Sequence, residues 1–433
     1  MLTAGEEVCL RERPAEVAAP PVGPSLELSV VMPCLNEART VGRCVEKALR
    51  TMRELGIAGE VVVSDNGSTD GSVEVAQQAG ARVVRQPLKG YGNALQKGFA
   101  EARGRFIIMG DCDESYDFTD LQRFVERLRG GADVVMGNRL KGEIKPGAMP
   151  WLHRWIGNPG LTWFLNLLFR TGVGDTHCGM RGFRRDALAK LRLHMPGMEF
   201  ASELVIKSAL ARQRVEEIPI TLWPDGRDRP PHLRSFRDGW RHLRFMLMCC
   251  PTFLFLLPGM ALMLLGLAAI PAVVVAGYGL FTNVFGPNFM YTASLASITG
   301  AHLIVFAVLA KLYAHQVDPV FHDPTIQKLA RFFSVERGLV FGLMLLACSA
   351  SIGLPVFIHW LQTLEMRTPA RWILAGTLFV LSIETIFTAF LVGILDLNRG
   401  DNGRVNTSAE LCPQTRSQPF ENARVAQEAS VAR

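Results

Sequence analysis

The chain has 433 residues, of which 49% are hydrophobic and 20% charged, and its formal net charge is +6 at pH 7. Its nine cysteines are scattered and form no C-x-x-C pair, so neither a zinc site nor a disulfide framework is indicated. Residues 245–310 contain no Asp, Glu, Lys or Arg, and soluble domains rarely leave so long a stretch uncharged. The composition therefore predicts a membrane protein with reduced thiols rather than a disulfide-bonded secreted domain.

Residues 1–26 contain acids and prolines but lack the apolar segment of a signal peptide, so we expect a flexible tail there. A second polar tail is expected over residues 398–433. Between the tails the composition changes once. It predicts a globular domain over 27–230, a membrane domain over 251–397, and an amphipathic segment over 231–250 that joins them.

From Leu28 to Leu222, short β-branched runs alternate with helix-like stretches. The expected strands are LSVVMP, EVVVSD, ARVVRQP, RFIIMGD and ADVVMGN. The helix between the first two would carry its apolar face on Val41, Val45, Ala48, Leu49 and Met52. Such alternation is typical of βαβ units, so we expect an α/β fold with a mainly parallel sheet flanked by helices.

Polar residues follow four of these strands at the points where the strands are expected to end. They are Asn36–Glu37, Asp65–Asn66, Asp111–Asp113 and Asn138–Arg139. Parallel α/β sheets bind their ligands beyond the carboxyl ends of the strands. The convergence of four polar clusters on one edge therefore predicts a binding site at that edge.

The second part contains four expected membrane spans, at residues 251–276, 291–313, 338–361 and 372–396. Each is long enough to cross a hydrocarbon core of about 30 Å. The connection after the second span carries Lys311, Lys328, Arg331 and Arg337, whereas residues 277–290 contain no Lys or Arg. The positive-inside rule then predicts a multi-pass protein of the inner (plasma) membrane with the globular domain and both termini in the cytosol.

A basic segment precedes the first span. One helical stripe would hold Arg234, Arg237, Arg241 and Arg244, and another face Trp240, Leu243 and Leu247. Beside a membrane span, such a segment predicts an interfacial helix that contacts anionic lipid rather than nucleic acid. A second candidate segment contains Trp151, Trp155 and Trp163, which suit either the head-group layer or an ordinary core.

The stretch Asp111–Asp113 initially allows three interpretations: a solvated turn, a cysteine-based redox or metal site, or a carboxylate pair for a divalent cation. Cys112 lacks a partner in any cysteine motif, which removes the second. Mg²⁺ and Mn²⁺ prefer oxygen ligands, commonly one or two carboxylates with substrate phosphates. Since the chain has no P-loop motif and no G-x-G-x-x-G after its first strand, a Walker ATP site and a Rossmann NAD site are not expected.

Seven motifs occur in order: PCLNE (33–37), DNGSTDGS (65–72), KGYGNAL (89–95), DCDESYDF (111–118), GNR (137–139), DTHCGMRGFRR (175–185) and EEIPI (216–220). Over about residues 28–245 they resemble family 2 glycosyltransferases of the polyprenyl-phosphate type, similar to dolichol-phosphate mannose synthases. The resemblance implies a GT-A type fold. It also implies an inverting hexosyltransferase that moves a sugar from a UDP- or GDP-hexose to a polyprenyl phosphate.

The resemblance assigns the residues of the donor side. Those implied to bind the donor are Pro33, Asn36, Glu37, Asp65, Asn66, Lys89, Gly90 and Asp111. With Asp113, Asp111 would also hold Mg²⁺ or Mn²⁺ on the donor diphosphate. The implied role of Asp113 is catalytic, because the cation neutralises charge on the leaving nucleoside diphosphate.

For the acceptor phosphate, the resemblance implies Arg139, Arg154, Asn158 and Arg181. Arg139 and Asp175 would join Asp113 in catalysis, with Asp175 acting either as a base or by orienting an arginine. A phosphate monoester is already ionised near neutral pH, so this nucleophile needs positioning more than deprotonation. The segment Cys178–Arg181 departs from the family's usual S-G-F-R.

Two other functions stay open. A processive polysaccharide synthase would carry a Q-x-x-R-W segment, which this chain lacks, and a catalytically silent transport or scaffold subunit would only sense nucleotide sugar. Glu384 and His302 fall inside expected spans, where an ionisable residue is either functional or a packing residue between helices. The motifs do not fix the sugar, the nucleotide, the lipid length or the oligomeric state, and an oligomer is compatible with them.

Overall fold

The computed structural model describes residues 26–227, 235–276, 287–323, 334–365 and 369–408. The chain divides into two compact units, Met1–Phe253 and Leu254–Arg433. Residues 1–25 and 409–433, which make up most of the two expected tails, lie outside the described residues.

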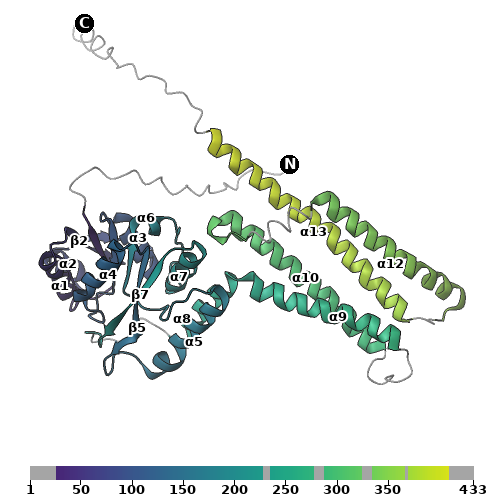
Figure 1. Ribbon diagram of the computed structural model, residues 1–433, viewed down its shortest axis with the longest axis horizontal. Coiled ribbons are helices and arrows are strands. Elements are labelled where there is room, and N and C mark those ends of the chain that lie inside the picture. Colours follow the sequence, from purple (N-terminus) through teal and green to yellow (C-terminus); the bar gives the residue numbers. More distant parts are fainter. Residues whose placement is uncertain (1–25, 228–234, 277–286, 324–333, 366–368, 409–433) are drawn as a thin grey trace, which may run out of the picture. The chain divides into compact units, whose positions relative to one another are not determined.

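The first unit is built on a seven-stranded sheet with helices on both faces (Figure 1). The strands are β1 (Leu28–Cys34), β2 (Gly59–Asp65), β3 (Arg82–Arg85), β4 (Phe106–Met109), β5 (Val134–Ile144), β6 (Arg181–Arg184) and β7 (Val215–Leu222), in the order β3-β2-β1-β4-β6-β5-β7. Four neighbouring pairs are parallel, and only β6 is antiparallel to its neighbours. The expected α/β fold is confirmed, and β6 and β7 add two strands to the five that were expected.

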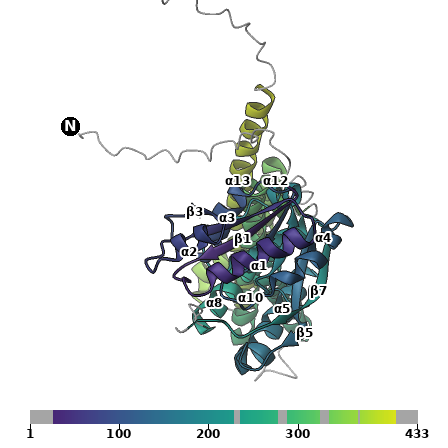
Figure 2. The same ribbon diagram turned by 90° about the vertical axis from the view of Figure 1, so that its left-hand side faces the viewer.

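The helices of this unit are α1 (Val41–Glu54), α2 (Ser72–Gln78), α3 (Tyr91–Glu101), α4 (Leu121–Arg129), α5 (Asn158–Phe169), α6 (Arg185–Ala189), α7 (Phe200–Leu210) and α8 (Ser235–Met248). The apolar face of α1 packs on the sheet, as its 3.6-residue spacing predicts (Figure 2). On the opposite face Gly98 of α3 lies directly against Val31. The strands are therefore buried on both sides, which explains their continuous apolar runs.

The register of the parallel strands brings their carboxyl ends to one edge. Cys34 pairs with Asp65, and Val31 pairs with Met109. The polar residues after β1, β2 and β4 therefore lie side by side, as expected. The fifth strand differs from the expectation, because it does not end before Asn138–Arg139. It continues to Ile144 since β7 still pairs with it, and its register is irregular between Asn138 and Glu143.

The second unit contains α9 (Leu257–Ala276), α10 (Pro287–Val317), α12 (Val335–Thr363) and α13 (Pro369–Ser408). Within the described residues, four helices are long and apolar enough to cross a membrane, which confirms the number of expected spans. Glycines allow close approach between them: Gly300 faces Gly259, and Gly338 faces Ala389. Helix α13 runs past the expected boundary at residue 397, because loss of hydrophobicity does not prevent a helix from satisfying its own backbone hydrogen bonds.

Candidate active site

The loops after β1 and β2 are held together by side-chain caps on backbone groups. Asp65 accepts hydrogen bonds from the amides of Gly67 and Ser68, at 3.1 and 2.9 Å. Asn36, which has a positive φ of 57°, accepts one from the amide of Thr69 at 2.8 Å. Both side chains are thereby fixed at the sheet edge, and Asp65 is buried. Pro33 lies at the same edge, and its carbonyl accepts a hydrogen bond from the Cys112 thiol at 3.1 Å.

A second loop closes over Asn66. The Asn66 side chain donates to the carbonyls of Gln86 and Leu88 and accepts from the amide of Gly90 at 2.7 Å. Lys89 returns to donate to the Asn66 carbonyl at 2.7 Å. Gly90 has φ 137° and lies against the Pro196 carbonyl, so only glycine fits there without strain. The implied donor residues on β2 and before α3 thus form one connected structure.

Asp111 and Asp113 follow β4 on this edge. Asp111 accepts a hydrogen bond from the hydroxyl of Tyr91 at 3.0 Å. Burial, together with the neighbouring Asp113 carboxylate, raises the pKa of Asp111 to about 6, against the lowering effect of Tyr91, Arg227 and Arg139. Carboxylates and guanidinium groups therefore share one electrostatic site here.

Arg139 and Asp175 form a buried bidentate ion pair. Nε of Arg139 lies 2.7 Å from Oδ2 of Asp175, and Nη2 lies 2.8 Å from Oδ1. The Arg139 amide adds a third contact at 3.0 Å. Although burial alone would raise it, the pKa of Asp175 is lowered by the Arg139 charge and these hydrogen bonds. Of the two roles left open by the sequence, this geometry favours orientation of Arg139 over a base.

The other implied acceptor residues are not equivalent. Arg181 is fully buried, and its guanidinium donates to the carbonyls of Cys178, Ala201 and Thr176 at 2.8, 3.0 and 2.9 Å. Those contacts make it a clamp inside the fold rather than a phosphate ligand. In contrast, Arg154 stacks on Trp155 near the surface, and the Asn158 amide contacts the Met149 sulfur at 3.5 Å.

Sequence reasoning missed three contributors to the site. Arg227, which is not among the expected site residues, forms ion pairs with Glu37 at 2.8 Å and with Asp113 at 3.0 Å. Tyr91 holds Asp111, and the Tyr116 hydroxyl accepts the Gly179 amide at 2.8 Å. The signal for the tyrosines was their place inside the KGYGNAL and DCDESYDF motifs, whereas Arg227 lies beyond the last motif.

The carboxylate pair fits a divalent cation in its chemistry. Within the described ranges, no cluster of three or more His, Cys, Asp or Glu side chains could hold a metal by itself. A cation beside Asp111 and Asp113 would therefore need oxygens from a bound phosphate and water, which is a common arrangement for Mg²⁺. The Asp113 carboxylate contacts the positive charge of Arg227, so in this structure a cationic group already lies at this position.

An exposed apolar surface lies on the same unit, over α5, α8 and the short turn η2 (His153–Gly157), and α5 contacts α8. Trp151, Trp155 and Trp163 are 67%, 61% and 66% exposed, so they are not ordinary core residues. Helix α8 adds Phe236 and Trp240 and turns the opposite face, Asp238 and His242, into the fold.

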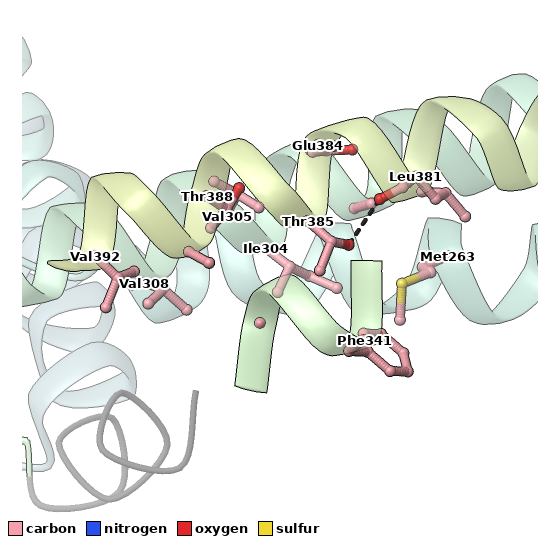
Figure 3. A pocket seen from close by; sticks show the side chains of 13 residues that line it. Met263, Ile304, Val305, Val308, Phe341, Leu381, Glu384, Thr385, Thr388 and Val392 are labelled. Carbon is pink, nitrogen blue, oxygen red and sulfur yellow. Dashed lines mark hydrogen bonds between the residues drawn. The ribbon is translucent and has the colours of Figure 1, made fainter. Parts of the chain in front are cut away.

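The second unit contains a cavity of about 280 Å³ between its helices, lined mostly by apolar side chains (Figure 3). Glu384 of α13 lines it, and both of its carboxylate oxygens are buried without a hydrogen-bond donor within the described residues. The side chain of His302 on α10 lies beside this carboxylate, with its Nδ1 3.2 Å from Oε1 of Glu384. The same nitrogen lies 3.0 Å from the Ile298 carbonyl oxygen. Glu384 and His302 therefore lie next to each other in the second unit, and their geometry assigns them no role.

An α/β sheet with carboxylates at the ends of its parallel strands, followed by four apolar helices, is the arrangement of a membrane-bound GT-A-like glycosyltransferase. The family model "Glycosyl transferase family 2" matches residues 29–192, and "Glycosyltransferase family 2 C-terminal transmembrane region" matches 308–396. The low-salt glycan biosynthesis hexosyltransferase of Haloferax volcanii is 38% identical, over 85% of this chain and 89% of the relative. The chain belongs to glycosyltransferase family 2.

Two further similarities concern the first unit. The dolichyl-phosphate hexose transferase of Haloferax volcanii is 32% identical, over 45% of this chain and 82% of that protein. A crystal structure of glucosyl-3-phosphoglycerate synthase from Mycobacterium tuberculosis, in complex with Mn²⁺, uridine diphosphate and glucosyl-3-phosphoglycerate, is 21% identical. It covers 52% of this chain and 80% of that chain with a TM-score of 0.42.

Proposed function

We propose that this glycosyltransferase moves a hexose from a UDP- or GDP-sugar to a polyprenyl phosphate, with inversion at the anomeric carbon. The observation that carries the proposal is the shared site of two kinds of group. The Asp111–Asp113 pair and the buried Arg139 lie close enough for the arginine to lower the pKa of Asp111. A donor diphosphate and an anionic acceptor need these two kinds of group together.

On the donor side, Pro33, Asn36 and Asp65 would face the nucleoside, with Lys89 and the Gly90 backbone beside the phosphates. Their connected loops would orient the donor at little entropic cost, because the caps on Asp65 and Asn66 already fix the backbone. Asp111 and Asp113 would hold Mg²⁺ or Mn²⁺. The bound cation would supply Lewis-acid stabilisation of the leaving nucleoside diphosphate.

On the acceptor side, Arg139 would pair with the lipid phosphate while Asp175 keeps its guanidinium in place. The phosphate oxygen would attack directly, since it is already ionised. Along the chain, Arg154 and Asn158 alternate with the exposed tryptophans Trp151, Trp155 and Trp163, so they would extend the phosphate site toward the lipid. The three carbonyl contacts of Arg181 argue for leaving it out of this group.

The dolichyl-phosphate hexose transferase among the relatives supports a lipid acceptor. So does the exposed apolar surface on α5 and α8, because tryptophan favours the head-group layer. We further propose that the catalytic domain and both termini are cytosolic and that the protein resides in the plasma membrane, on the distribution of Lys and Arg between the spans.

The test uses the purified full chain with Mg²⁺ or Mn²⁺, a labelled nucleotide sugar and polyprenyl phosphate. We expect label in an organic-extractable, mild-acid-labile lipid, and mass spectrometry should find one sugar on one lipid. Asp113→Ala should lose transfer by at least about 100-fold, whereas Asp186→Ala, which removes an exposed aspartate that pairs with Arg184, should not.

Other outcomes would replace the proposal. A polymer as the product would identify a processive synthase. Donor binding without turnover, across several lipid acceptors, would identify a silent transport or scaffold subunit. Normal labelling by Asp113→Ala would contradict the metal assignment.

A further inference from the structure

Arg227 forms ion pairs with Glu37, which the family resemblance assigns to the donor, and with Asp113, which the proposed function assigns to the cation. Its Nε lies 2.8 Å from Glu37, and its Nη2 lies 3.0 Å from Oδ2 of Asp113. The three side chains are 17%, 5% and 8% exposed, so this is a largely desolvated contact. Burial alone would lower the pKa of Arg227, but Asp113, Glu37 and Asp111 outweigh it and raise the pKa.

The backbone delivers Arg227 to this place. Residues 222–226 run beside the Asp113–Tyr116 turn: Leu222 bridges Tyr116, and the amide of Trp223 donates to the Ser115 carbonyl at 3.0 Å. The amide of Gly226 then donates to the carbonyl of Asp113 itself at 2.9 Å. The segment that carries Arg227 is therefore bound to Asp113 twice, by the backbone hydrogen bond of Gly226 and by the ion pair of the guanidinium.

Both oxygens of the Asp113 carboxylate already have donors. Oδ1 accepts from the amide and the hydroxyl of Ser115, at 3.0 and 2.5 Å, and Oδ2 pairs with Arg227. A divalent cation needs a carboxylate oxygen as a direct ligand. Since Oδ1 already has two donors from its own turn, the cation would take Oδ2, where the positive charge of Arg227 opposes it unless Arg227 moves away.

We propose that Arg227 is an internal counter-ion that competes with the divalent cation for Asp113, and that the anionic diphosphate of the donor draws it away. This deepens the proposed function and rests on it. Cation and nucleotide then bind cooperatively, because the cation displaces Arg227 from Asp113 while the diphosphate offers the released guanidinium a new anion. By linkage, each ligand raises the affinity for the other by the same factor.

The test measures Mn²⁺ binding to the detergent-solubilised full chain by electron paramagnetic resonance of the free ion, with and without UDP or GDP. For Arg227→Gln, we expect Mn²⁺ alone to bind about tenfold more tightly than to the wild type, as expected when one competing charge is removed. The nucleotide should then add less to the Mn²⁺ affinity than it does in the wild type. Arg227→Lys keeps the charge but cannot span both carboxylates, and should fall between them.

Arg43→Gln is the matched control, because it removes an equal charge that pairs at 2.7 Å with Glu114, the residue next to Asp113 in the chain. It should leave Mn²⁺ binding within about twofold. Unfolding midpoints of all variants, measured alongside, separate lost folding from altered binding.

The possible failures are distinguishable. If Arg227→Gln binds Mn²⁺ no more tightly than the wild type while Asp113→Asn abolishes binding, the counter-ion proposal is overturned and the metal site stands. If Asp113→Asn leaves Mn²⁺ binding intact, the metal assignment falls, and the counter-ion proposal falls with it. Tight Mn²⁺ binding by the wild type without nucleotide, equal to that of Arg227→Gln, would also overturn the competition.

Discussion

Two buried aspartate–arginine pairs lie on the two sides of the site, and the fold holds them differently. Asp175 grips Arg139 with two parallel contacts and a backbone amide, and the two side chains are 0% and 10% exposed. Asp113 contacts Arg227 through one carboxylate oxygen, and the Arg227 guanidinium pairs with both Asp113 and Glu37. The difference suggests a fixed half that positions the acceptor and an exchangeable half that admits cation and donor.

The largest effect should come from breaking the fixed pair. Asp175→Asn leaves the buried Arg139 charge without its counter-ion, and we expect a loss of about 3–5 kcal/mol in the free energy of unfolding, together with loss of sugar transfer. Chemical denaturation of the solubilised chain measures the first. Asp186→Asn, which breaks an exposed pair with Arg184, should cost less than about 1 kcal/mol. Equal costs for the two variants would show that Asp175 is not a fixed partner.

The second effect concerns Arg181, which holds three carbonyls on the same side of the sheet. Arg181→Lys replaces three separated donor nitrogens by one ammonium group, so we expect a loss of about 2–3 kcal/mol in unfolding free energy. The KM for the lipid phosphate should stay close to the wild-type value in protein that remains folded. A large rise in that KM with unchanged stability would return Arg181 to the acceptor site.

These residues also show how much of the fold and of the site the sequence predicts. The runs around β1 to β4 and the polar residues at their ends were predictable, because burial on both faces and strand-end chemistry leave strong local patterns. Strand β6 was not predictable, since its four residues carry no periodic signal. Arg227 was not either, because its partner Glu37 lies 190 positions away and only the closed fold brings them together.

A third effect should appear on lowering the pH, on the fixed side. Burial, with a smaller contribution from the Arg181 charge, lowers the pKa of His242 to about 4, against the opposing charge of Asp238. The unfolded chain takes up this proton near pH 6.5 and the folded chain does not, so stability should fall as pH drops below about 6.5. Between pH 7.5 and pH 5 we expect a loss of about 2 kcal/mol from this group.

His242→Gln can keep the contact with Ser202, at 2.8 Å in the native structure, and should reduce that pH dependence. The exposed His194 provides the control, and His194→Gln should leave the dependence unchanged. Thermal unfolding at the two pH values measures both. An unaltered slope in His242→Gln would mean that His242 is not a buried neutral side chain.

The smallest effect on stability should come from the exchangeable pair. Arg227→Gln leaves the Glu37 and Asp113 carboxylates without this counter-ion, but the loop keeps its backbone hydrogen bonds. We therefore expect a loss of about 1–2 kcal/mol in unfolding free energy, below the effect of Asp175→Asn because the Arg227 side chain is partly exposed. A cost as large as that of Asp175→Asn would remove the contrast between the two halves.

The most direct measurement of the central claim is a panel of labelled UDP- and GDP-hexoses, each incubated with the full chain, Mg²⁺ or Mn²⁺ and undecaprenyl phosphate. We predict that one donor transfers its label to the organic phase, and that Arg139→Gln abolishes this transfer while the protein still binds the nucleotide. Label that never enters the lipid with any donor, or equal transfer by Arg139→Gln, would contradict the assignment of a lipid-phosphate acceptor to this site.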